Sequence, residues 1–198
     1  MTLRGKRWVL FGGSLVFLTA SLLLPGEMGK LAVLLLGAAA LLVLLYRNMG
    51  ELTGVEEGNP KLGLLQQTVL FTFGFLALAV GAVWLVATGR VSERQEELLA
   101  AGLLCVFMVY LGNIAPRLPF NRYVGFRLPW TVTDEDTWIV CHRLISYLTL
   151  PALVLYVAGV LALPGRVVQV TIVAMLVWAG IPAALSGLFF YRKFHPKT

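Results

Sequence analysis

Residues 62–88 read LGLLQQTVLFTFGFLALAVGAVWLVAT, and this stretch contains no Asp, Glu, Lys or Arg. A helix needs about 20 apolar residues to cross the hydrocarbon core of a bilayer, which is about 30 Å thick. The stretch therefore predicts a membrane-spanning helix. Its polar side chains Gln66, Gln67, Thr68 and Thr72 gather near one end, where bonding to neighbouring helices is favoured over lining a cavity.

Five further apolar stretches flank this one, and hydrophobic residues make up 59% of the 198 positions against 13% charged. Soluble domains average about 45–50% and about 25%. Backbone groups in hydrocarbon must be satisfied internally, and the short alternating pattern of barrel strands is absent, so the spans are predicted to be helices. The expected spans are 8–24, 31–46, 62–88, 98–114, 145–163 and 167–191.

This pattern predicts an all-α fold, a polytopic bundle of six transmembrane helices forming a single membrane domain over residues 1–198. A secretory signal is the alternative reading of the first span, but the run over 8–24 exceeds the usual apolar region of about 7–15 residues. Pro151 and Pro182 are expected to kink their helices. The small-residue spacings Ala77 with Gly81 and Ala183 with Gly187 are candidates for close helix contacts.

The distribution of Lys and Arg predicts the orientation, because cationic loops are retained on the cytoplasmic side. Twelve of the 16 cations fall in the ends and connections that would share one side, including Arg117, Arg122 and Lys197. The other side holds Lys30, Arg90, Arg94 and Arg166. Both termini are therefore predicted to be cytoplasmic. The net charge of +6 is scattered without forming a basic face, so direct nucleic-acid binding is not expected.

The connection between the fourth and fifth spans differs from an ordinary linker. Residues 112–131 read GNIAPRLPFNRYVGFRLPWT, which interleaves aromatic residues, Pro and Arg. Such a composition favours a structured cytoplasmic loop next to the membrane, followed by an amphipathic helix, together covering 113–144. Thr133 is expected to cap that helix, with the carboxylates of residues 134–136 in its first turn. Arg127 needs an acceptor near the membrane surface, which could be a lipid phosphate, the carbonyl end of a helix or those carboxylates, and we expect it to pair inside the loop.

Helical spacing places Trp138, Cys141, His142 and Ile145 on one face, which we expect to pack inward. Cys141 and His142 lie about 100° apart on a helix, so a nucleophile and base pair formed by these two is not expected. Neither cysteine has the spacing of a metal site or a disulfide framework. We therefore predict no enzyme activity, no metal and no cofactor.

The residues of this segment resemble the SdpI family of bacterial membrane immunity proteins. The resemblance consists of an Asn at a helix end, a Pro, an Asn-x-x-x-Gly-x-Arg-x-Pro-Trp-Thr motif, an acidic stretch, a Trp and a His-Arg pair. Its residues are Asn113, Pro116, Asn121, Gly125, Arg127, Pro129, Trp130, Thr131, Trp138, His142 and Arg143.

The resemblance implies a protein of the bacterial cytoplasmic membrane that gives resistance to a secreted, membrane-active toxic peptide by binding. It also implies signalling through a cytoplasmic transcriptional repressor. Two alternatives stay open: a small transporter or exporter, against which the absence of charged residues in mid-span argues, and a membrane scaffold for a cytoplasmic partner. Trp130, Trp138 and Tyr123 could form a peptide-binding platform, but anchoring at the bilayer interface is favoured.

Overall fold

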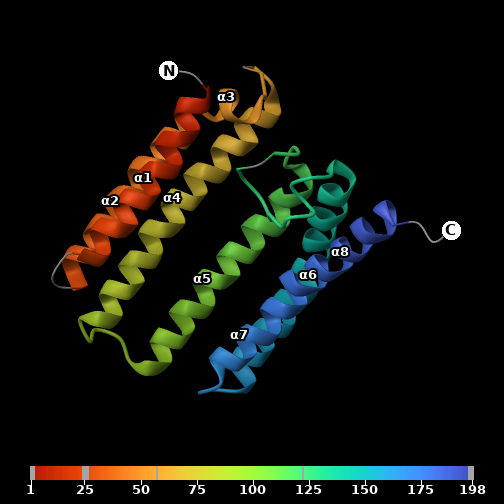
Figure 1. Cartoon of the computed structure of the whole chain (residues 1–198). Coiled ribbons are helices and arrows are strands. Elements are labelled where there is room, and N and C mark those ends of the chain that lie inside the picture. Colours follow the sequence, from red (N-terminus) through yellow and green to blue (C-terminus); the bar gives the residue numbers. More distant parts are fainter. Residues whose placement is uncertain (1–2, 24–26, 57, 122, 196–198) are drawn as a thin grey trace. The chain divides into compact units, whose positions relative to one another are not determined.

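The computed structural model describes residues 3–23, 27–56, 58–121 and 123–195, and every regular element among them is a helix (Figure 1). Two of the cations that were counted to predict the orientation, Arg122 and Lys197, lie outside the described residues, as do the side chains of Arg4 and Arg7. The elements are α1 Leu3–Leu23, α2 Glu27–Arg47, α3 Met49–Thr53, α4 Pro60–Ala87, α5 Glu93–Ile114, the 3₁₀ turn η1 Ala115–Arg117, α6 Glu135–Ala162, α7 Val167–Met175, the π turn η2 Leu176–Gly180 and α8 Ile181–Phe194.

Four stretches among the described residues are long and apolar enough to cross a membrane: Pro60–Ala87, Glu93–Arg117, Glu135–Ala162 and Val167–Phe194. The apolar parts of the first two helices, Trp8–Leu23 and Ala32–Arg47, are shorter. The all-helical membrane class is confirmed, whereas the count of six spans and the single domain stay predictions. α5 and α6 begin before the apolar runs predicted at 98 and 145, because their polar first turns extend the helix beyond its membrane-buried part.

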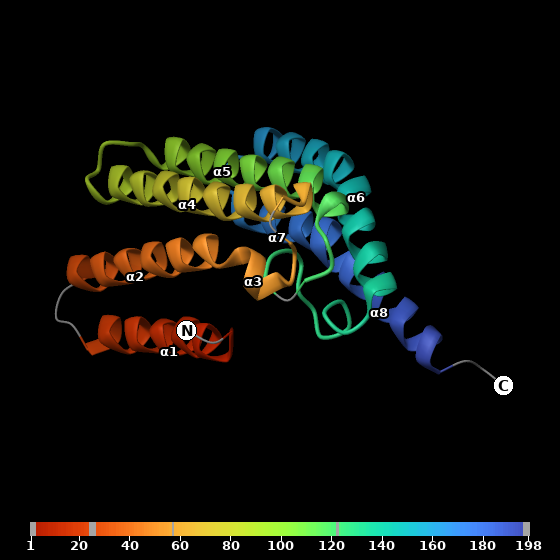
Figure 2. The ribbon, with the colours of Figure 1, turned by 90° about the horizontal axis from the view of Figure 1, so that it is seen from above.

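The chain divides into two compact units, Met1–Phe73 and Gly74–Thr198. In the first unit α1 and α2 pack side by side as a hairpin (Figure 2), and a Cβ at Gly37 would collide with the ring of Phe17. Lys6 of α1 forms an ion pair with Glu51 of α3, with 2.6 Å between the ammonium nitrogen and the carboxylate oxygen. A close helix contact therefore joins α1 to α2, and an ion pair joins α1 to α3.

In the second unit α6 is the central helix, and it packs against α5, α7 and α8. Gly112 of α5 lies so close to α6 that a Cβ there would collide with the side chain of Thr149. The Thr149 hydroxyl donates to the Ile145 carbonyl oxygen (2.7 Å) and accepts from the Trp178 indole N–H (2.8 Å). This buried hydroxyl therefore bonds α6 to η2, and the glycine of α5 makes room for it.

The span from α7 to α8 contains a π turn at η2, where the Ile181 N–H donates to the Leu176 carbonyl oxygen five residues back. Pro182 follows in the first turn of α8. Because proline has no N–H to donate, the helix changes its hydrogen-bond register next to it. The sequence signal at Pro182 thus marks a real irregularity, which is a π turn.

Two predicted helix-to-helix contacts are not found in the part of the chain that the structure describes. The hydroxyls of Thr68 and Thr72 donate to carbonyl oxygens of their own helix, Leu64 (2.9 Å) and Thr68 (2.8 Å). A Cβ at Gly81 would meet no atom within 4 Å. Threonine can satisfy its hydroxyl within its own helix, so polarity alone does not predict a partner helix.

Candidate functional site

The connection between α5 and α6 is a compact loop at one end of the second unit (Figure 1). It begins with η1, where Pro116 stands in the first turn and the Leu118 N–H donates to the Ala115 carbonyl oxygen (3.2 Å). We call the six residues that fix this loop, Asn121, Gly125, Phe126, Thr131, Trp138 and His142, the loop cluster.

Asn121 organises the first half of the loop. Its side-chain oxygen accepts from the backbone N–H groups of Tyr123 (2.8 Å) and Val124 (2.7 Å). Its side-chain nitrogen donates to the carbonyl oxygens of Pro119 (2.8 Å) and Val124 (3.0 Å). The residue is buried, so this amide replaces the solvent that the backbone of a tight turn would otherwise need.

Gly125 marks the closest approach of the loop to α6. Its φ is +122°, a backbone conformation that side chains disfavour. A Cβ at this position would lie 2.7 Å from a ring carbon of Trp138 and 2.8 Å from Nε2 of His142. Both the backbone angle and the space therefore require glycine here.

His142 bonds the loop to α6 through both of its ring nitrogens. Nε2 accepts from the Phe126 backbone N–H (3.0 Å), and Nδ1 lies 2.9 Å from the Trp138 carbonyl oxygen. An N–H donor at Nε2 requires that nitrogen to be unprotonated, and the carbonyl oxygen at Nδ1 requires a proton there. The geometry thus assigns a neutral imidazole with its proton on Nδ1.

Trp138 covers this histidine and binds the start of the loop. The two rings are stacked, with centroids 3.9 Å apart and planes 27° apart. The indole N–H of Trp138 donates to the Leu118 carbonyl oxygen (3.2 Å), and Phe120 packs edge-on against the indole. Neighbouring turns of α6 therefore hold two separate points of the loop, Leu118 and Phe126.

Thr131 fixes the second half of the loop. Its hydroxyl accepts from the Leu128 N–H (2.8 Å) and faces the carbonyl oxygens of Phe126 (3.0 Å) and Leu128 (3.1 Å). The side chain is fully buried. Nearby, the Thr133 hydroxyl donates to the carbonyl oxygens of Pro129 and Trp130 and so belongs to the same turn.

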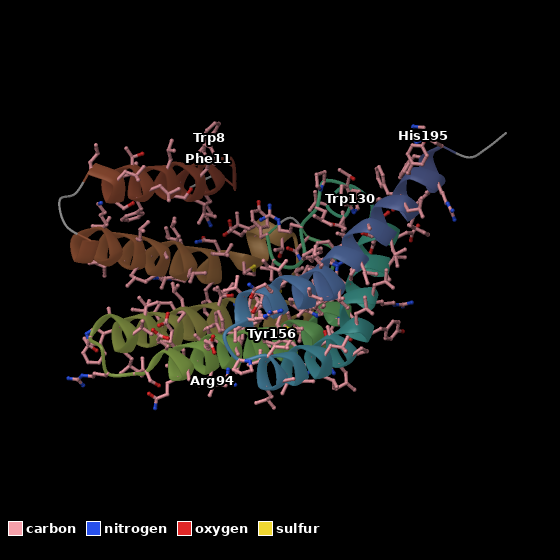
Figure 3. The ribbon with its side chains drawn as sticks, turned by 90° about the horizontal axis from the view of Figure 1, so that it is seen from below. Trp8, Phe11, Arg94, Trp130, Tyr156 and His195 are labelled. Carbon is pink, nitrogen blue, oxygen red and sulfur yellow. The ribbon has the colours of Figure 1, made fainter. Side chains whose placement is uncertain are left out.

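Trp130 connects the loop to α8, and Figure 3 shows it at the loop beside that helix. Its indole N–H donates to the Ser186 hydroxyl (3.0 Å), which in turn donates to the Ala183 carbonyl oxygen (3.1 Å). A Cβ at Gly187 would contact the indole at 3.4 Å. The Ala183 and Gly187 spacing therefore admits a loop tryptophan to the face of α8.

The cap of α6 is Asp134, which corrects the prediction of Thr133. One carboxylate oxygen of Asp134 accepts from the Thr137 N–H (2.9 Å) and hydroxyl (2.6 Å). The other binds the Lys193 ammonium group at 2.5 Å, and Lys193 also binds Asp136 (2.8 Å). Burial raises the pKa of the Asp134 carboxyl, but the hydrogen bonds from Lys193 and Thr137 outweigh it and hold that pKa below its ordinary value.

Arg127 does not take the partner that we predicted for it. Its side chain is exposed, and Lys193 rather than Arg127 pairs with the carboxylates of Asp134 and Asp136 among the described residues. His142 and Thr131 accept from the backbone N–H groups of Phe126 and Leu128 on either side of Arg127, whose own side chain is exposed.

The predicted site residues thus fall into two groups. Asn121, Gly125, Thr131, Trp138 and His142 meet in the loop cluster, and Trp130 joins it to α8. Four other predicted residues, Asn113, Pro116, Pro129 and Arg143, are exposed, and Asn113 accepts a long hydrogen bond from Arg117 (3.4 Å).

Three residues that complete the site were missed from the sequence. Phe126 acts through its backbone, which side-chain patterns do not reveal. Ser186 lies between the small residues Ala183 and Gly187, so the spacing that we noted could have pointed to it. Lys193 stands far along the chain from its carboxylate partners and carried no local signal.

The helices and the bonded loop define a class, an all-helical membrane protein whose central helix carries a folded connection at one end. Residues 117–186 match the model of the SdpI/YfhL protein family, and the predicted resemblance to the SdpI family is therefore confirmed over this segment. The match runs from η1 through the loop cluster to Ser186. Neither the curated proteins nor the solved structures include a match to the chain.

Proposed function

We propose that the chain is an immunity protein of the bacterial cytoplasmic membrane, which gives resistance to a secreted, membrane-active toxic peptide by binding it. The support is that the family match and the loop cluster coincide: the matched segment contains every residue that fixes the loop on α6. The residues of the motif therefore hold the loop in one conformation on α6. A protein that protects by binding needs such a fixed conformation.

Binding without catalysis is part of this proposal. Both nitrogens of His142 already have partners, Phe126 and Trp138, so this imidazole has no free nitrogen to accept a proton from the neighbouring Cys141. The same saturation applies to the amide of Asn121 and the hydroxyl of Thr131. Groups bound in this way hold the loop and are poor candidates for reacting with a substrate.

We further propose a chain that crosses the membrane six times with both termini in the cytoplasm. α1 and α2 have 21 residues each, about 31 Å of helix. Their apolar parts, Trp8–Leu23 and Ala32–Arg47, are shorter, so crossing a hydrocarbon core about 30 Å thick requires the charged side chains at their ends to extend to the membrane surface. The excess of Lys and Arg then assigns the loop cluster to the cytoplasmic side. A toxic peptide arrives from outside, so the loop acts on it by fixing the bundle rather than by direct contact.

The test is survival of a sensitive bacterium that expresses the chain and is exposed to a membrane-active peptide, with membrane protein levels matched between variants. Expression should raise survival. Asn121→Ala, which removes the organising amide, should abolish the protection, whereas Arg127→Ala should preserve it. Loss of protection in the arginine variant alone would instead make the exposed loop surface the contact, and efflux driven by an ion gradient would favour a transporter.

A second candidate function is signalling through a cytoplasmic transcriptional repressor. The observation that favours it is a rigid loop that presents the exposed Arg127 next to Phe126, whose backbone is fixed by His142. A photo-reactive residue at position 127 in living cells should capture a soluble regulator when the toxic peptide is present. Capture of only lipid or of the chain itself at that position would argue against signalling through this surface.

A further inference from the structure

A groove of about 560 Å³ runs between α6 and α7, at the end of the second unit remote from the loop cluster along α6. Apolar side chains form most of its walls, and Gly159 lies against Val170 at its base. Two polar residues, Arg166 and Gln169, stand at one end of the groove, next to the turn between the helices. Tyr156, labelled in Figure 3, also lines the groove and bonds to Thr171 of α7 through its hydroxyl (3.0 Å).

The length of the groove corresponds to one leaflet of a bilayer. One wall extends from Ala152 of α6 to Leu163, which directly follows that helix, and the other from Arg166, which directly precedes α7, to Val177 of η2. Each wall rises about 16 Å at about 1.5 Å per residue, and half of a hydrocarbon core is about 15 Å. A groove of this length would reach from the membrane surface, at its polar end, to the middle of the bilayer.

The charge at the polar end is available to a ligand. Arg166 is exposed, and no hydrogen bond or ion pair engages its guanidinium among the residues that the structure describes. Arg94 makes a useful contrast, because its guanidinium binds both the Glu97 carboxylate (2.9 Å) and the Val160 carbonyl oxygen (3.1 Å). A guanidinium at a membrane surface binds phosphate in a bidentate manner when no carboxylate occupies it.

We propose that this groove binds one anionic phospholipid, whose phosphate contacts Arg166 and whose acyl chain lies along the apolar walls of α6 and α7. Two observations support this proposal. The apolar groove has the length of one leaflet, and the Arg166 guanidinium at its polar end has no partner among the described residues. Neither the family match nor the immunity function enters this argument.

A second groove on the same unit shows why charge matters. It lies between α6 and α8, has a volume of about 640 Å³, and is also lined by apolar side chains such as Leu188 and Phe189. Its polar end contains Arg192 and Lys193, and it also contains the carboxylate of Asp136, which binds Lys193 at 2.8 Å. A phosphate beside Arg192 would also meet the Asp136 carboxylate, which repels it, so we expect this second groove to select an anionic lipid less strongly than the first.

The test is lipid titration of the purified full chain in detergent, followed by native mass spectrometry. The probes are phosphatidylglycerol, phosphatidylcholine with the same acyl chains, and inorganic phosphate. Wild type should retain one phosphatidylglycerol more tightly than phosphatidylcholine and should not respond to free phosphate. Arg166→Gln should raise the dissociation constant for phosphatidylglycerol at least about tenfold, because a charge-assisted hydrogen bond is lost.

Matched controls separate the groove from general effects on the fold. Val173→Trp fills the groove and should also weaken binding, whereas Val168→Trp changes an exposed residue of the same helix outside the groove and should not. Arg90→Gln removes a cation that already lies over the Trp84 ring and should leave binding unchanged. Equal affinity for the two lipids, or unchanged binding in both Arg166→Gln and Val173→Trp, overturns the proposal, as does capture of a second copy of the chain in the groove.

Discussion

The two ends of α6 are built in opposite ways, although both connect this helix to a neighbour. At its beginning, the α5 to α6 loop bonds its backbone to side chains of the helix, and Gly125 is pressed against Trp138 and His142. At its end, a short turn with Gly165 at φ +79° leads into α7, and a Cβ on that glycine would meet no atom within 4 Å. The first connection is specified by side-chain packing and side-chain hydrogen bonds. The second is specified by backbone conformation and a backbone hydrogen bond from the Arg166 N–H to the Leu163 carbonyl oxygen (3.1 Å).

This difference indicates that substitutions should be tolerated less well in the loop than in the turn. Polar backbone beside a membrane must be satisfied, and a long connection has more of it to satisfy than a short turn. The loop meets that demand with the amide of Asn121, the hydroxyl of Thr131 and the imidazole of His142. The turn at Gly165 needs only a residue that tolerates a positive φ.

The largest expected effect compares these two glycines. Gly125→Ala adds a Cβ at 2.7 Å from the Trp138 ring as well as strain at positive φ, so it should destabilise the protein by about 3 kcal/mol or more. Gly165→Ala adds only the backbone strain, about 1 kcal/mol. Thermal unfolding of both variants in detergent micelles measures the difference. Similar losses would show that the loop is not packed against α6 as described.

The next effect concerns the two histidines of the chain. His142→Phe keeps an aromatic ring over Trp138 but leaves the Phe126 N–H without its acceptor, which should cost about 2 kcal/mol. His195 is the matched control, because it also stacks on the aromatic residue four positions earlier, Tyr191, but is exposed and binds no loop. His195→Phe should change stability little. Equal melting temperatures for the two variants would contradict the acceptor role of His142.

A smaller effect is expected at the contact between the loop and α8. Trp130→Phe retains most of the ring but removes the hydrogen bond to Ser186, and a loss of about 1 kcal/mol is typical of such a bond. Ser186→Ala removes the same bond from the other side. The double variant should therefore lose less than the sum of the two single losses. Strict additivity would mean that the two side chains do not interact.

Much of this site could be predicted from the sequence, because its residues are neighbours along the chain or on one helix face. The spacing of Trp138, Cys141, His142 and Ile145 correctly predicted a buried face, since a helix fixes which side chains point together. The Pro, Arg and aromatic residues of the loop predicted a structured connection, and hydrogen bonds from the loop to His142 and Trp138 agree with that prediction. What helical periodicity could not give is the partner of each side chain.

The two wrong predictions, the cap of α6 and the partner of Arg127, have the same physical cause. In each case two residues of similar chemistry could fill the same role. Thr133 and Asp134 can both cap a helix, and the cap is Asp134, whose second oxygen also binds Lys193. Arg127 and Lys193 can both pair with the acidic residues, but the bonds that fix the loop backbone leave Arg127 exposed. Sequence spacing does not rank such alternatives, because the ranking depends on the position of a distant helix.

The smallest expected effect tests that ranking at Asp134. Asp134→Asn retains a side chain that caps a helix well but removes the charge that Lys193 binds, so it should lower stability only slightly. Asp134→Ala removes the cap as well and should cost about 1 kcal/mol more. Thermal unfolding of the two variants at neutral pH measures separately how much the helix cap and the ion pair contribute to stability.

The same carboxyl gives a dependence on pH. Because its pKa is lowered in the folded protein, the unfolded chain binds the proton first as the pH falls. The stabilisation is complete above the unfolded pKa of about 3.9 and disappears as the pH drops through the lower folded value. The stability difference between wild type and Asp134→Asn should therefore shrink below about pH 4 and stay constant above about pH 5. A difference that grows on acidification would contradict a bond between Lys193 and an ionised Asp134.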